Sequence, residues 1–266
     1  MFNSTNERFN VNLSGSEKKP MMFAHGLGCD QSMWRFITPH FEQDHKIILF
    51  DYLGSGASDI ESYKKDKYSS LEVYADDVIE IIQSLNVKDV IFAGHSAGAM
   101  IGMLAAIKAP ELFSHIIMVG PSPCYINQPG YTGGFEKKEI DALLDRMKVN
   151  LCEWSKTFAP VIMGNEERPA LSNELQESFL SSNHEILYHF ARLNFTSDLR
   201  EHVEKIKTPV LIMQCAEDII APEEVGKYLH KNIPKNKLVK MNATGHCAHL
   251  SEPDETISLI KEYLKE

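Results

Sequence analysis

A serine lies between two glycines in the segment Gly94-His95-Ser96-Ala97-Gly98, which fits the pattern Gly-x-Ser-x-Gly. This pattern is typical of a nucleophilic serine on a sharp turn, because the residues two positions away must lack bulky side chains. The apolar run 89–92 predicts a buried strand before the turn, and the run 97–109 predicts a buried helix that ends before Pro110. The N-terminus of that helix would stabilise an oxyanion. This context favours a nucleophile at Ser96 over an incidental serine in a glycine-rich turn.

A serine hydroxyl is almost fully protonated at neutral pH and therefore needs a general base. His246 follows the last predicted strand, 237–241, and Asp218 follows the strand before it, 209–214. Parallel strands place their carboxyl ends at one edge of a sheet, where ligands bind, so these side chains can meet there. An acid at this position fixes the tautomer of the base and stabilises its cation. We therefore predict a triad of Ser96, Asp218 and His246, although each residue taken alone could be structural.

An oxyanion hole needs two N–H donors. Ala97, which follows the serine, is expected to supply one through its backbone. The loop after the predicted strand 20–24 is expected to supply the other, and this places Leu27 in that role.

Other polar residues near these positions have simpler interpretations. Asp51 also follows a predicted strand, but its glycine-rich loop favours a structural role. His95 and His249 are interpreted as structural. His246 and His249 could form a metal-binding pair, but no third ligand lies at a recognisable spacing. We therefore expect neither a metal ion nor a cofactor.

Strands and helices alternate along most of the chain, which predicts a mostly parallel sheet with helices on both faces. Ser69 and Glu72 have the spacing of a capping box at the start of one helix. Apolar patterns predict strands at 8–13, 20–24, 46–50, 89–92, 115–119, 209–214 and 237–241, and helices after Asp30, at 71–85, 97–109 and 222–232, and from Pro253.

The alternation stops after Gly120, and no strand is predicted from there to about residue 195. Apolar residues at helical spacing, with a break near Asn150, predict a helical lid at 121–196, inserted into a core formed by 1–120 and 197–266. A lid would exclude water and shape an apolar pocket. The side chains expected in that pocket are His25, Trp154, Phe158 and Phe190, although ordinary core packing explains most single aromatic residues.

The composition of the 266 residues disfavours several kinds of partner. The net charge is −10 and no long Lys/Arg block occurs, so we expect neither nucleic acid nor an anionic membrane as a partner. The first ten residues are polar, and the longest apolar stretch is too short to span a bilayer. The five cysteines contain no Cys-x-x-Cys pair, which favours a reducing, cytoplasmic location.

Several segments resemble one family of α/β-hydrolases, in which the triad residues follow the chain order Ser, Asp, His. Segments 25–34, 50–56 and 94–98 are similar to the family that holds the plant strigolactone and karrikin receptors. Segments 120–125, 215–222 and 245–249 are similar to the RsbQ-type bacterial stress-response regulators within it. The resemblance covers nearly the whole chain, lid included. It implies Ser96, Asp218 and His246 as the triad, with Leu27 and Ala97 as oxyanion donors.

The resemblance further implies a role in signalling. RsbQ-type proteins act upstream of a general-stress sigma factor, together with a PP2C-type phosphatase that carries a PAS domain. The first hypothesis is therefore a signalling hydrolase that acts on a small hydrophobic ester or lactone. The second is a metabolic carboxylesterase or carbon–carbon bond hydrolase without a partner. The third, a binding module with a vestigial triad, is disfavoured because all three triad residue types are present.

Overall fold

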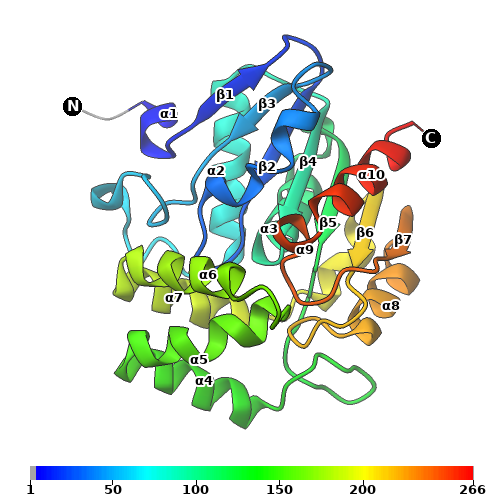
Figure 1. The fold of residues 1–266 in the computed structure, drawn as a ribbon. Helices are drawn as coiled ribbons and strands as arrows, with labels where there is room; N and C mark the ends of the chain where they lie inside the picture. Colours follow the sequence, from blue (N-terminus) through cyan, green and yellow to red (C-terminus); the bar gives the residue numbers. More distant parts are fainter. Residues whose placement is uncertain (1–3, 266) are drawn as a thin grey trace.

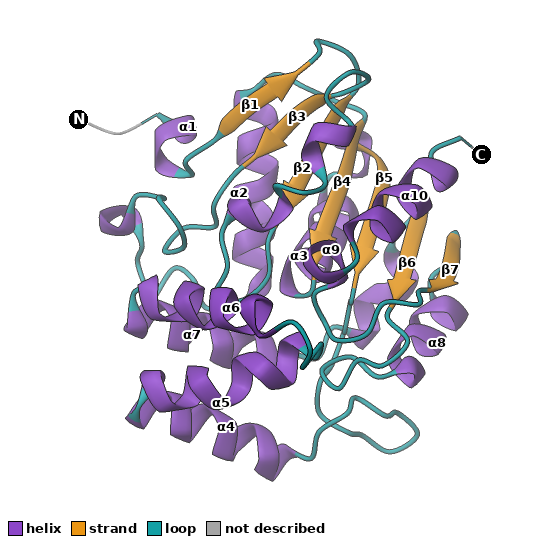
Figure 2. Cartoon of the chain, viewed as in Figure 1, coloured by secondary structure: helices purple, strands orange, loops and turns teal. Residues whose placement is uncertain are grey.

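A seven-stranded sheet forms the centre of the structure, a computed structural model that describes residues 4–265 (Figures 1 and 2). The strand order is β1-β3-β2-β4-β5-β6-β7, and all neighbours are parallel except β1 with β3. The strands are β1 Asn12–Gly15, β2 Pro20–Ala24, β3 Lys46–Leu49, β4 Val90–His95, β5 Phe113–Val119, β6 Val210–Gln214 and β7 Asn236–Lys240. The order reverses at β2, so the carboxyl ends of β2 and β4 flank the crevice where such sheets bind ligands.

Each face of the sheet packs against its own group of helices, because successive strand residues point to opposite sides. Met22 belongs to the core beneath α2, α3 and α8, whereas Met21 belongs to the core beneath α10. Figures 1 and 2 show α2 and α3 behind the sheet and α10 in front of it. These helices are α2 Leu71–Ser84, α3 Ala97–Lys108, α8 Glu223–Asn232 and α10 Pro253–Tyr263. The predicted sheet with helices on both faces is thereby confirmed.

Four further helices lie between β5 and β6 in the chain and cover the carboxyl ends of the strands (Figure 1). They are α4 Lys137–Val149, α5 Leu151–Met163, α6 Pro169–Ser181 and α7 His184–Thr196. Asn150 caps both α4 and α5, at the predicted helix break, and its side chain accepts a hydrogen bond from the N–H of Glu153. A separate apolar core joins these helices to Cys29 and Leu250 of the sheet-bearing part.

The structure corrects two of the local predictions. A strand was expected at 8–13, but a capping box between Ser4 and Glu7 starts a helix, and the strand begins at Asn12. The capping box expected at Ser69 is absent, because Ser70 is the N-cap of α2 and makes no side-chain cap bond.

The remaining elements are short and connect the long ones. They are α1 Thr5–Arg8, α9 Ala248–Ser251 and the 3₁₀ helices η1 Gln31–Trp34, η2 Thr38–His40, η3 Ile60–Ser62, η4 Pro110–Leu112 and η5 Arg200–Lys205. A helix was predicted after Asp30, and Asp30 caps η1 by accepting a hydrogen bond from the N–H of Ser32. Within the described residues no helix has both the length and the apolar character needed to cross a membrane.

Candidate active site

Ser96 occupies a strained turn between β4 and α3. Its backbone angles, φ 53° and ψ −118°, lie in a region that side-chain-bearing residues rarely adopt. The two flanking glycines are required by close contacts: a Cβ on Gly94 would lie 2.5 Å from the carbonyl carbon of Gly98. A Cβ on Gly98 would lie 2.5 Å from the carbonyl oxygen of His25. The glycines therefore allow β4 and α3 to approach closely enough to project the serine.

His246 and Asp218 form a buried pair at the same edge of the sheet. The distance between His246 Nδ1 and Asp218 Oδ2 is 2.7 Å. The other carboxylate oxygen accepts hydrogen bonds from the N–H groups of Ile220 and Ala221, at 2.9 and 3.0 Å. Because Asp218 can only accept, the imidazole carries its proton on Nδ1. Nε2 of His246 is left as a buried acceptor with no partner among the described residues.

Ser96 and His246 line one small cavity of about 30 Å³. Its wall is mostly apolar and combines the sheet edge with the helices above it. The lining residues are Leu27, Cys29, His95, Ser96, Tyr125, Phe158, Ile162, Leu175, Phe179, Asn194, Phe195, Ile220, His246 and Cys247. The structure thus brings two of the predicted triad side chains to one cavity and places Asp218 behind His246.

Tyr125 and Asn194 add polar groups to this cavity that sequence reasoning missed. The Tyr125 hydroxyl lies 3.4 Å from Ser96 Oγ and also contacts the Asn194 side chain. Burial raises the pKa of Tyr125, so the hydroxyl stays protonated and can donate a hydrogen bond. Tyr125 follows β5 in an irregular loop, outside any periodic pattern, so no signal in the sequence marked it.

Only Phe158 of the four predicted pocket residues lines the cavity. Trp154 lies one layer behind, with its ring 5.0 Å from that of Phe158 and 5.1 Å from that of Phe179. Phe190 faces α2 instead, where its ring lies 4.7 Å from that of Tyr74.

His25 also lies outside the cavity. Its Nε2 accepts a hydrogen bond from the N–H of Tyr52 at 3.1 Å, and its Nδ1 lies 2.9 Å from the carbonyl oxygen of Gly26. Both ring nitrogens are therefore hydrogen-bonded to the backbone of loops, and this explains why the side chain points away from the cavity.

The two expected oxyanion donors reach Ser96 from different parts of the chain: Ala97 follows it directly, whereas Leu27 belongs to the loop after β2. Leu27 lines the cavity, and Ala97 is the first residue of α3. Neither N–H has an acceptor among the backbone hydrogen bonds of the described residues outside helices and strands. The first N–H groups of a helix have no acceptor within it, so the Ala97 N–H is free to bind an oxyanion. The role of both groups stays a prediction.

Asp51 holds three segments together. Its carboxylate accepts hydrogen bonds from the Gln31 N–H, the Ala57 N–H and the Asn10 side-chain amide, at 2.9, 3.0 and 2.7 Å. These contacts support the structural interpretation of Asp51.

Two further histidines, His95 and His249, are buried beside His246. His95 Nε2 donates a hydrogen bond to the carbonyl oxygen of His246 at 2.9 Å, and the rings of His95 and His249 lie 4.3 Å apart. Burial holds the pKa of His95 well below its usual value and lowers the pKa of His249 to about 3. Within the described residues, no group of three or more His, Cys, Asp and Glu side chains is arranged to hold a metal ion.

Replacing His249 with phenylalanine should reduce the loss of stability in acid. The unfolded chain binds a proton at His249 near the usual pKa of about 6.5, whereas the folded protein binds it only near pH 3. Between these values the unfolded state binds more protons, so stability is full above the higher value and falls as pH decreases. His249→Phe should flatten this dependence by about 1 kcal/mol per pH unit within that window.

Urea denaturation at pH 7.5, 6, 5 and 4, values chosen to span roughly the window between the two pKa values, would measure the slope. The exposed His40 gives the matched control, His40→Phe. An equal slope in both variants would contradict the prediction. The ring of Trp34 lies tilted against that of His249, with centroids 4.7 Å apart, and so gives a phenylalanine at position 249 an aromatic neighbour.

Comparisons with known proteins show which family the sequence and the fold resemble. The sequence model of the alpha/beta hydrolase family matches residues 21–259. A karrikin insensitive 2 receptor of Petunia hybrida is 35% identical over 259 residues, covering 97% of this chain and 96% of the relative. A strigolactone esterase of Pisum sativum is 36% identical over 249 residues, covering 93% of each. The solved structure of a hydrolase from Oleispira antarctica superposes with a TM-score of 0.96, at 40% identity, covering 98% of this chain and 96% of that one.

Proposed function

The chain belongs to the alpha/beta hydrolase family and is related to the plant strigolactone and karrikin receptors, and we propose that it hydrolyses a small hydrophobic ester or lactone with Ser96 as nucleophile. One observation carries the proposal. The buried His246–Asp218 pair, 2.7 Å apart, leaves Nε2 of the imidazole without a partner at the cavity that also contains Ser96.

The chemistry follows from this arrangement. Ser96 Oγ attacks the carbonyl carbon of the substrate while His246 Nε2 accepts the hydroxyl proton. Asp218 stabilises the imidazolium that forms, and the N–H groups of Leu27 and Ala97 bind the oxyanion. The imidazolium then gives its proton to the leaving oxygen, and an acyl ester remains on the serine. Water, deprotonated by the same imidazole, hydrolyses this ester and frees the enzyme.

The cavity wall indicates the substrate class. Apart from Ser96 and the histidines, its polar side chains are Tyr125 and Asn194, both neutral amide or hydroxyl groups, and neither lysine nor arginine lines it. A neutral acyl group with an apolar body fits such a wall, whereas a dicarboxylate or phosphate ester would be desolvated without a compensating charge.

A substrate can enter only if the helices above the cavity move. A volume of about 30 Å³ holds roughly two water molecules, far below the several hundred Å³ of a typical ligand site. Phe158, Ile162 and Phe179 close the cavity from α5 and α6. We therefore take residues 121–196 as a lid with closed and open states, inserted into a core formed by 1–120 and 197–266.

We further propose that the protein is an RsbQ-type positive regulator of a general-stress sigma factor in the cytoplasm, acting through a PP2C-type phosphatase that carries a PAS domain. The curated relatives include proteins named as receptors and others named as esterases, which supports hydrolysis and ligand sensing in one family. A ligand alters a partner only through its different affinities for two protein states, and the lid supplies two such states.

A sigma-factor reporter in bacterial cells that lack their own regulator would test this role. Wild type should restore the response, Ser96→Ala should not, and the surface variant Lys137→Glu/Lys138→Glu should lose the response while keeping ester hydrolysis. Lys137 and Lys138 are exposed at the start of α4, away from the cavity. Full restoration by Ser96→Ala would make the protein a binding switch, and failure of wild type would favour a stand-alone carboxylesterase or carbon–carbon bond hydrolase.

A further inference from the structure

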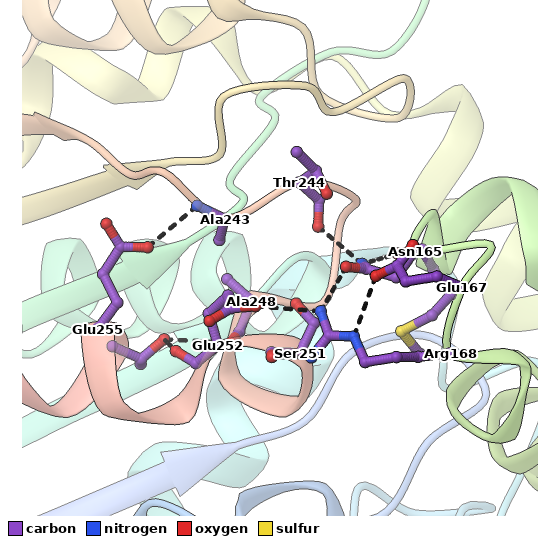
Figure 3. Close-up of polar contacts among 11 residues, drawn as sticks. Asn165, Glu167, Arg168, Ala243, Thr244, Ala248, Ser251, Glu252 and Glu255 are labelled. Carbon is purple, nitrogen blue, oxygen red and sulfur yellow. Dashed lines mark hydrogen bonds and ion pairs between the residues drawn. The ribbon is translucent and has the colours of Figure 1, made fainter.

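The turn between α5 and α6 touches the loop that carries His246. We call residues 162–168 the corner and residues 242–247 the base loop; Figure 3 shows Asn165 and Arg168 of the corner beside Thr244 of the base loop. The two backbones meet at glycines. A Cβ on Gly245 would lie 1.9 Å from the carbonyl oxygen of Met163, and one on Gly164 would lie 3.2 Å from Gly245 Cα. Only glycine fits this contact on the base-loop side.

Hydrogen bonds join the corner to the base loop directly. The N–H of His246 donates to the carbonyl oxygen of Ile162 at 2.8 Å. The side-chain amide of Asn165 donates to the carbonyl oxygens of Met163 and Thr244, at 2.9 and 3.1 Å. Asn165 has a positive φ of 55°, a conformation that asparagine tolerates better than most residues. The backbone of the base is therefore held by residues of the lid.

Arg168 fixes the corner to the core. Its guanidinium donates to Asn165 Oδ1 at 2.5 Å, to the carbonyl oxygen of Ser251 at 2.6 Å and to Glu252 at 3.0 Å (Figure 3). Ser251 and Glu252 follow the base loop through the short helix α9. One arginine thus connects the lid side chain that holds Thr244 to the chain just beyond the base loop.

The opposite side of the base loop is attached to the core. The carbonyl oxygen of His246 accepts from His95 Nε2 at 2.9 Å, and the N–H of Gly245 donates to the carbonyl oxygen of Glu217 at 2.7 Å. Glu255 of α10 accepts from the N–H groups of Asn242 and Ala243, at 2.8 and 3.0 Å. The base loop is therefore clamped between the core and the lid.

We propose that Asn165 and Arg168 are positioning residues for His246, so that the state of the lid sets the position of the base. Ile162 makes the link, because it lines the cavity and its carbonyl oxygen accepts the N–H of His246. A substrate that displaces α5 also displaces the acceptor of that N–H. The proposal rests on the proposed role of His246 as the base; the corner is the part of the lid through which opening reaches the triad.

Steady-state hydrolysis of p-nitrophenyl butyrate would test this with three variants. Asn165→Gly removes the amide without straining a positive φ. Arg168→Met removes the charge and its donors, and Arg168→Lys keeps the charge. The matched controls are Asn173→Ala on α6 and Arg192→Met on α7, both exposed and away from the base loop. Thermal unfolding midpoints close to that of wild type would show that the variants fold.

Asn165→Gly and Arg168→Met should lower kcat by on the order of tenfold to a hundredfold while KM changes by less than about threefold, since a small misplacement of a catalytic group costs this much. Arg168→Lys should recover part of the loss, and the controls should match wild type. Values of kcat for both variants equal to those of the controls would overturn the proposal.

Amide hydrogen exchange gives a readout that needs no activity. The clamp predicts faster exchange across 242–247 in Asn165→Gly and Arg168→Met than in the controls, because the N–H of His246 loses a fixed acceptor. Unchanged exchange would overturn the clamp. A wild-type rate of hydrolysis in His246→Ala would instead show that His246 is not the base. The exchange rates would still show whether the corner holds the base loop in place.

Discussion

Replacing Ser96 with glycine should abolish ester hydrolysis and make the protein more stable. Loss of the nucleophile lowers kcat by on the order of a millionfold in serine hydrolases whose triads act as a unit. The stability gain follows from the backbone: at φ 53° and ψ −118° a side chain is strained, and glycine is not. The strain costs about 1–3 kcal/mol and the flexibility of glycine costs about 0.5–1 kcal/mol, so a net gain is expected.

Hydrolysis of p-nitrophenyl butyrate and labelling by a fluorophosphonate probe would measure the loss of the nucleophile, and urea denaturation would measure the gain in stability. Ser122 gives the matched control, because it is buried near the same sheet edge and donates a hydrogen bond to the carbonyl oxygen of Cys124. Ser122→Ala should keep both the labelling and the turnover. Labelling that persists in Ser96→Gly would place the nucleophile at another residue. A lower stability of Ser96→Gly than of wild type would contradict the backbone strain inferred at this position.

Asp218→Asn should lower kcat by about 10⁴-fold through the tautomer of the base. The asparagine Oδ1 can still accept from the N–H groups of Ile220 and Ala221, so the loop should keep its shape. Its amide would then face His246 Nδ1 as a donor, and the imidazole would move its proton to Nε2. A protonated Nε2 cannot accept the proton of Ser96.

His246→Ala should reduce turnover by about a hundredfold to ten-thousandfold, which is the usual contribution of a positioned general base. When either change is combined with Ser96→Ala, kcat should fall no further than in Ser96→Ala alone, because the three side chains act as a unit. Stopped assays with the single and double variants at equal protein concentration would show this. Full activity of Asp218→Asn would move the acid role to Asp51, against the contacts that tie its carboxylate to Gln31 and Ala57.

The parts of the fold and site that the sequence predicts are those encoded over short distances. The glycines around Ser96 mark the turn because their contacts lie within one strand–turn–helix unit. The parallel strands could be read from apolar runs, and their shared carboxyl edge placed His246 and Asp218 on one side. The break near Asn150 could be predicted from the sequence because this one residue ends α4 and begins α5.

The walls of the cavity could not be predicted because they depend on how separate helices pack. Trp154 and Phe158 are four residues apart on one face of α5, yet Phe158 lines the cavity whereas Trp154 packs against Phe179 of α6. Phe190 belongs to a face of α7 that packs on Tyr74 of α2. Tyr125 and Asn194 meet across an irregular loop and a helix, a contact that no periodic pattern encodes.

The crossover between β5 and β6 has a consequence for the synthesis of the chain. Ser96 and its turn are complete once β5 has been made, but Asp218 and His246 follow the helices α4, α5, α6 and α7. Until β6 emerges and pairs with β5, the apolar edge of β5 stays open, and such edges invite pairing with other chains. A nascent chain therefore carries the proposed nucleophile without the proposed base, and we expect it to gain hydrolytic competence only when its last strands join the sheet.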